Sequence, residues 1–234
     1  AHEIVHQWYG NTATESDWLH IWLSEGFATY LTHMYMETYY GRDQFFKRMK
    51  ADRNTIANFA GTWARPVVDS TVTDYMSLLN PNSYEKGGWV LHMLRNKIGD
   101  ENFGKLLKAY YEKFKYANAS TEDFRAVAEK IGGQDLKQFF TQWLYTKGHP
   151  KLEMEWAWKK GPKQVMLTVR QTQPQAFSFP IELAFLTEQG TTTLKQVEIN
   201  SAVQNFTLDL PSVPSELVVD PSVKLLAEFK LKHL

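Results

Sequence analysis

The residues best suited to chemistry stand at the start of the chain, where His2, Glu3 and His6 form an HExxH pentad. On an α-helix, residues i and i+4 share a face one turn apart, so both imidazoles can bind one metal ion. Glu3 would lie near that ion without binding it, and could take a proton from a water whose pKa Zn²⁺ lowers towards 7. The competing interpretation is a solvated helix face with two unrelated histidines.

A third ligand would favour the zinc interpretation, because catalytic zinc sites use three protein ligands and a water. Glu25 follows His6 after 18 intervening residues, in the segment 17–40 that we expect to be a second helix with Asp17 as its N-cap. If a short turn around Gly10-Asn11 makes the two helices antiparallel, Glu25 faces the two imidazoles. The spacing therefore predicts a site with two His ligands and one Glu ligand.

The residues around these positions resemble a known family. The stretches HEIVHQWYGN at 2–11 and WLSEGFA at 22–28 are similar to the zinc site of the aminopeptidase N family of gluzincin zinc metallopeptidases, which also includes leukotriene hydrolase. The similarity continues at RPVV, 65–68, and at SYEKGG, 83–88. It covers the whole chain, strongly to about residue 98 and more loosely after it. Ser24 stands where the family more often has Asn.

The resemblance implies one Zn²⁺ per chain, with His2, His6 and Glu25 as its ligands and Glu3 as the general base. It also implies a role for Tyr84, because the family's tyrosine at this position donates a hydrogen bond to the oxyanion of the tetrahedral intermediate. A phenol aimed at developing negative charge is physically suited to that role.

For other polar side chains, the sequence gives less support for a role in the site. Lys86 and Arg95 could meet a substrate carboxylate, although solvation or structural ion pairing is the preferred interpretation. The remaining imidazoles have no partner at ligand spacing. We expect surface or capping roles for His20, His33, His92, His149 and His233.

The pattern of apolar residues changes near residue 149. Before it, one apolar stripe predicts a helix over 103–114, a capping box at Ser120 and Asp123 opens another that ends at Gly132-Gly133, and a third covers 136–144. Beyond Pro150 the period drops to two. Strands are predicted within 152–157, 165–170, 181–187, 192–199, 205–210 and 216–219.

These elements predict an α+β fold with two domains. Residues 1–149 would form the mainly helical portion of a zinc peptidase catalytic domain, which the resemblance implies is thermolysin-like. Residues 150–234 would form a small antiparallel β-sandwich.

Composition excludes several classes of protein. The 26 basic and 26 acidic side chains cancel, so nothing indicates a nucleic-acid partner. The absence of cysteine excludes disulfides and thiolate zinc ligands. No apolar run approaches the roughly 20 residues of a membrane-spanning helix, and no targeting segment fixes the compartment.

The function that the resemblance implies is that of a zinc-dependent metalloaminopeptidase, which hydrolyses N-terminal peptide bonds of peptide substrates with Glu3 as general base. The chain lacks the Gly-x-Met-Glu-Asn segment with which the family's aminopeptidases recognise the free amino group. We therefore expect a fragment without the N-terminal part, weakly active or inactive alone and prone to self-association. The alternatives are a catalytically silent interaction module and a hydrolase of a non-peptide substrate, such as an epoxide, on the same fold.

Overall fold

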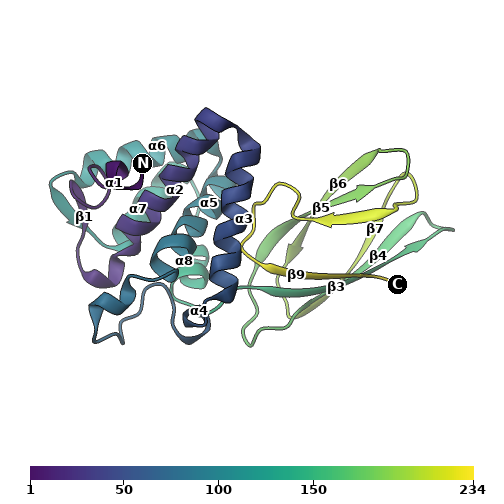
Figure 1. Ribbon diagram of the computed structural model, residues 1–234. Coiled ribbons are helices and arrows are strands. Elements are labelled where there is room, and N and C mark those ends of the chain that lie inside the picture. The colour runs from purple at the N-terminus through teal and green to yellow at the C-terminus, as the bar shows by residue number, and fades with distance from the viewer. The chain divides into compact units, whose positions relative to one another are not determined.

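Helices form the regular structure of the chain as far as Gly148, apart from two very short strands, and strands form it beyond that point (Figure 1). The computed structural model describes residues 1–234 and divides into two units, Ala1–Gly148 and His149–Leu234. The predicted α+β class is confirmed. We expected the division one residue further along, between residues 149 and 150, and the assignment of the two units as separate domains stays a proposal.

The first unit is built from eight α-helices. They are α1 His2–Val5, α2 Trp22–Tyr40, α3 Arg42–Asn58, α4 Gly61–Ala64, α5 Gly87–Ile98, α6 Asp100–Phe114, α7 Thr121–Gly132 and α8 Lys137–Leu144. The connections contain 3-10 turns at Trp18–His20 and Tyr75–Leu78, a π-helical turn at Asn82–Lys86, and the parallel strands β1 Ala13–Glu15 and β2 Ala117–Ala119.

The three helices with clear sequence signals are confirmed. Helix α7 begins with a capping box, in which the backbone N–H of Asp123 donates to the Ser120 hydroxyl at 3.2 Å and the Ser120 N–H donates to the Asp123 carboxylate at 2.9 Å. It ends at Gly133, whose φ of 64° lies in the left-handed region. Helix α8 covers most of its predicted range. The predicted stripe of α6 is buried through Phe103, Leu106, Tyr110 and Phe114.

Helices α2 and α5 approach so closely that their contact needs glycine. A Cβ at Gly26 would lie 2.8 Å from the carbonyl carbon of Gly87, and one at Gly87 would lie 3.1 Å from the Gly26 Cα. Helix α5 is buried from residue 87 to residue 94, so neither helix can move away cheaply. Because Gly26 follows Glu25 and Gly87 follows the π-helical turn, this contact brings the turn beside the start of α2.

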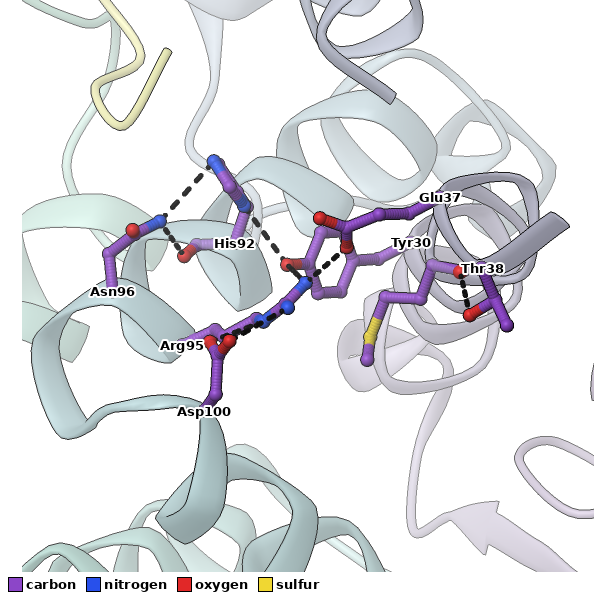
Figure 2. A network of polar contacts seen from close by, with 8 residues as sticks. Tyr30, Glu37, Thr38, His92, Arg95, Asn96 and Asp100 are labelled. Atoms are coloured by element: carbon purple, nitrogen blue, oxygen red, sulfur yellow. Dashed lines mark hydrogen bonds and ion pairs between the residues drawn. The ribbon is translucent and has the colours of Figure 1, made fainter. Parts of the chain in front are cut away.

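A polar network fixes the other half of α2 against α5 (Figure 2). The Tyr30 hydroxyl lies 2.9 Å from Nδ1 of His92 and 3.4 Å from Arg95, which donates to Glu37 at 2.9 Å and to Asp100 at 2.8 Å. Burial raises the pKa of Tyr30, so this hydroxyl stays protonated. Arg95 therefore makes structural ion pairs, as preferred from the sequence.

The second unit consists of two β-sheets. Its strands are β3 Lys151–Lys159, β4 Gln164–Gln171, β5 Phe179–Leu186, β6 Thr192–Ile199, β7 Val203–Asp209, β8 Glu216–Val219 and β9 Glu228–His233. The strand order is β7-β4-β3-β9 in one sheet and β6-β5-β8 in the other.

Period-two burial produces the core of this unit. Met154 pairs with Val169 and Trp156 with Leu167 across β3 and β4, and all four side chains are buried. The rings of Trp156 and Phe185 lie 6.5 Å apart, centroid to centroid, and bring the two sheets into contact. The period-two segments are thus strands, as predicted.

The antiparallel sandwich is confirmed except at one sheet edge, where β9 was not predicted and runs parallel to β3. Strand β9 lies at a sheet edge and is largely exposed, so its apolar alternation is weak. Its position next to β3 depends on chain topology, which a local pattern does not contain.

The segment before α2 also differs from expectation. Helix α1 ends at Val5, before the turn expected around Gly10-Asn11, and the connection to α2 is not a short turn, since it includes β1 and a 3-10 turn. Asp17 caps that 3-10 turn, accepting the Leu19 N–H at 2.9 Å, and α2 begins only at Trp22. None of the helices combines the length and apolar character needed to cross a bilayer.

Candidate metal centre

The two histidines of the pentad lie on one face at the first turn of the molecule. The backbone N–H of His6 donates to the carbonyl of His2 at 3.3 Å, which completes one helical turn between them. Their Nε2 atoms lie 3.1 Å apart. The i,i+4 spacing thus places the two imidazoles on one helix face, as expected from the sequence, although α1 itself is short.

Glu25 joins the two imidazoles from the first turn of α2. Its Oε2 lies 3.3 Å from Nε2 of His2 and 3.3 Å from Nε2 of His6. A tetrahedral zinc ion with bonds of about 2.1 Å would place its ligand atoms about 3.4 Å apart. The three donor atoms therefore fit zinc in chemical type and in separation, and they form the one group of three acidic or imidazole side chains suited to a metal ion.

A backbone carbonyl orients one of these candidate ligands. Nδ1 of His6 lies 3.2 Å from the carbonyl oxygen of Tyr9, which can only accept, so the proton belongs on Nδ1. This tautomer leaves the lone pair of Nε2 free and directed at His2 and Glu25. Such a hydrogen bond to the distal nitrogen is the usual way in which proteins orient a metal-binding imidazole.

Tyr84 lies beside the same cluster, on the π-helical turn. Its ring stacks on that of His2, with centroids 6.0 Å apart and planes 11° apart. Burial, the charge of Glu25 and a hydrogen bond to Glu25 raise the pKa of Tyr84 to about 12, with a smaller contribution from the charge of Glu3. The phenol is therefore a protonated donor at neutral pH, and Glu3 is close enough for its charge to act on it.

The turn that carries Tyr84 is anchored at both ends by buried polar groups. The Lys86 side chain is fully buried, and its Nζ donates to the carbonyl of Gly148 at 2.8 Å. At the other end, Thr62 donates to the Asn82 side chain at 3.0 Å. Burial lowers the pKa of Lys86 to about 7. Lys86 thus supports the turn from behind, and no sequence signal indicated that it would be buried.

The remaining histidines do not join the site, but the surface or capping role expected for them was wrong in three cases. His33, His92 and His149 are buried. Nε2 of His33 lies 2.7 Å from the Asp52 carboxylate, and Nε2 of His149 lies 2.8 Å from that of Glu228. Imidazole is amphipathic, so a histidine paired with a carboxylate is as compatible with a core as with a surface.

Sequence comparison places residues 1–143 within the family described as "Peptidase family M1 domain". Aminopeptidase M1-C of Oryza sativa subsp. japonica is 33% identical over 159 residues, covering 66% of this chain and 18% of that protein. Human glutamyl aminopeptidase is 31% identical over 179 residues, covering 75% of this chain and 19% of that protein. The chain thus spans about a fifth of the length of the curated relatives it matches.

Structural comparison supports the same fold. Legionella pneumophila aminopeptidase A, whose crystal structure was determined in complex with aspartic acid, superposes with a TM-score of 0.79. The match covers 98% of this chain and 26% of that protein, at 22% sequence identity. At this identity the likeness concerns the fold of the chain, including its strand-rich second unit.

Proposed function

The chain belongs to the peptidase M1 family, and on that basis we propose that it carries the metal centre of a zinc-dependent aminopeptidase. The observation that supports this most is the triangle of His2, His6 and Glu25, whose donor atoms lie 3.1 to 3.3 Å apart. When bound there, one zinc ion would supply a Lewis acid for the scissile carbonyl and lower the pKa of the attacking water.

The proton transfers are assigned to Glu3. Its side chain is exposed, and its carboxylate can accept a proton from the attacking water and return it to the leaving amine. Glu3 lies between the two proposed ligands in sequence and is not part of the metal-binding group, and its charge acts on Tyr84 beside that group. An exposed carboxylate there would be covered when a peptide binds.

Tyr84 is assigned to stabilise negative charge on the carbonyl oxygen. With a pKa of about 12, its phenol keeps its proton and can donate a hydrogen bond throughout the neutral range. The close contact of Gly26 and Gly87 and the buried Lys86 hold the turn that carries it. Because the turn is fixed before the substrate arrives, only the phenol proton has to turn from Glu25 to the substrate oxygen, and this preorganisation is the origin of the catalytic benefit.

The substrates we propose are peptides with a free N-terminus, since the relatives named above are aminopeptidases. The presence of all five residues proposed for the ligand, base and donor roles supports an active site over a catalytically silent module. We further propose that the units Ala1–Gly148 and His149–Leu234 serve as a catalytic part and a β-domain of the protein.

The experiment compares hydrolysis of alanine 4-nitroanilide with that of its N-acetylated counterpart by the full-length protein. We expect turnover of the free amine only, abolished by a zinc chelator. Glu3→Gln should retain zinc and lose turnover by at least about 100-fold, because an amide cannot accept the proton. Absence of turnover in the wild type would favour a silent module, and equal turnover of the blocked substrate would exclude an aminopeptidase.

A further inference from the structure

A third carboxylate, in addition to those of Glu3 and Glu25, lies next to the metal centre. Glu15, at the end of β1, accepts a hydrogen bond from the hydroxyl of Ser24. Ser24 is buried and directly precedes Glu25 on α2. A buried hydroxyl that donates to a carboxylate makes a charge-assisted bond, stronger than a bond between neutral groups.

The position of Glu15 is fixed by its backbone. Strand β1 pairs with β2, with Glu15 opposite Ala119, and the Asn118 side chain donates to the Glu15 carbonyl at 3.0 Å. The next residue, Ser16, donates its N–H to the Ala119 carbonyl at 2.9 Å. The carboxylate is thus presented from a constrained strand and can impose a position on Ser24.

Ser24 in turn contacts the loop that orients His6. A Cβ at Gly10, where φ is 122°, would lie 2.9 Å from Nδ1 of His6 and 3.2 Å from Oγ of Ser24. Gly10 therefore fills the narrow space between the imidazole and the hydroxyl, and it follows Tyr9, whose carbonyl accepts from that imidazole. A shift of Ser24 would displace His6, because the two side chains pack on either side of Gly10. It would also displace Glu25, which follows Ser24 in the chain.

We propose that Glu15 is a positioning residue of the metal centre, which acts through Ser24 on the ligands His6 and Glu25. The proposal rests on the proposed function, since it presumes that these ligands hold zinc. Glu15 contributes in two ways: its acceptor oxygen fixes the Ser24 hydroxyl, and its negative charge near the cluster favours binding of a cation. Groups in this indirect position commonly change metal affinity by about 10- to 100-fold.

The test measures zinc affinity of the full-length protein, by competition with a chromophoric chelator. Glu15→Ala and Ser24→Ala should each weaken binding by about 10- to 100-fold. The double variant should be no weaker than the weaker single variant, because both changes break one connection. Glu15→Gln keeps an acceptor oxygen without the charge and should bind between the wild type and Glu15→Ala. Glu112→Gln, which alters an exposed carboxylate paired with Lys115, should bind like the wild type.

The outcomes separate this inference from the proposed function. If the wild type binds no zinc, the proposed function is wrong and this inference with it. If the wild type binds zinc and Glu15→Ala binds equally tightly, only this inference is wrong. If the losses of zinc-binding free energy in Glu15→Ala and Ser24→Ala add fully in the double variant, Glu15 does not act through Ser24. That result would also overturn this inference. The melting temperature of the metal-free variants serves as the control for folding. If either alanine variant is unfolded, the zinc affinity of Glu15→Gln relative to the wild type decides the test.

Discussion

At the scale of single residues, the candidate centre depends on few and local relations. His2 and His6 share a helical turn, and the Tyr9 carbonyl sets the tautomer of His6. These relations follow from the spacing of neighbouring residues, which is why the ligand set could be proposed from the sequence. Tyr84 is different, because it is distant along the chain and no spacing rule connects it to the pentad.

The substitution Tyr84→Phe tests the role of the phenol. It should lower kcat by about 100- to 1000-fold in the full-length protein and alter KM much less, since the hydrogen bond forms to charge that develops in the transition state. Steady-state kinetics of both enzymes on one aminoacyl substrate give the comparison. A nearly normal kcat would remove Tyr84 from the mechanism.

The pKa of Tyr84 also predicts part of the pH profile of the wild type. Because this pKa is about 12, deprotonation of Tyr84 should not reduce the rate between pH 7 and 10.

At the scale of elements, periodic segments could be predicted and contacts between elements could not. The stripe of α6 and the capping box of α7 are encoded within one helix each. At Gly26 and Gly87 the backbones of two helices come into close contact because neither residue has a side chain. No pattern of apolar residues in the sequence indicates such a contact. The same limitation hid strand β9, whose partner β3 lies far away in sequence.

The π-helical turn yields a prediction about pH, through Lys86. The usual pKa of lysine is 10.5 and that of the buried amine is about 7, so between these values the unfolded chain binds more protons than the folded one. Stability therefore rises with pH in this window, because the cost of burying the charged amine is complete below pH 7 and absent above 10.5. Lys86→Met removes that dependence.

Urea unfolding of the full-length protein at pH 7, 8 and 9 measures the effect. The free energy of unfolding of the wild type should rise relative to that of Lys86→Met by at most about 1.4 kcal/mol per pH unit. Lys105→Met, at an exposed lysine paired with Glu101, should show no such trend. A difference between wild type and Lys86→Met that stays constant from pH 7 to 9 would mean that Lys86 keeps its ordinary pKa when folded.

At the scale of the whole molecule, apolar surface and charge favour association. Ile4 is 61% exposed and Trp8 is 48% exposed on the segment that carries the pentad, and Tyr39 is 68% exposed at the end of α2. The net charge of zero provides no long-range repulsion between copies. The 234-residue chain prepared alone should therefore form oligomers, and Trp8→Glu should reduce them. Light scattering over a range of concentrations measures this, and a constant mass of 27.2 kDa would refute it.

The central claim, that His2, His6 and Glu25 hold one zinc ion, is tested most directly by metal analysis of the full-length protein purified without chelator. We predict about one zinc ion per chain in the wild type and in Glu198→Ala, a change of an exposed carboxylate on β6. We predict loss of most of the zinc in Glu25→Ala, because two imidazoles leave the ion without its third protein ligand. Equal zinc content in Glu25→Ala and the wild type would contradict the assignment of Glu25 and the metal centre as described.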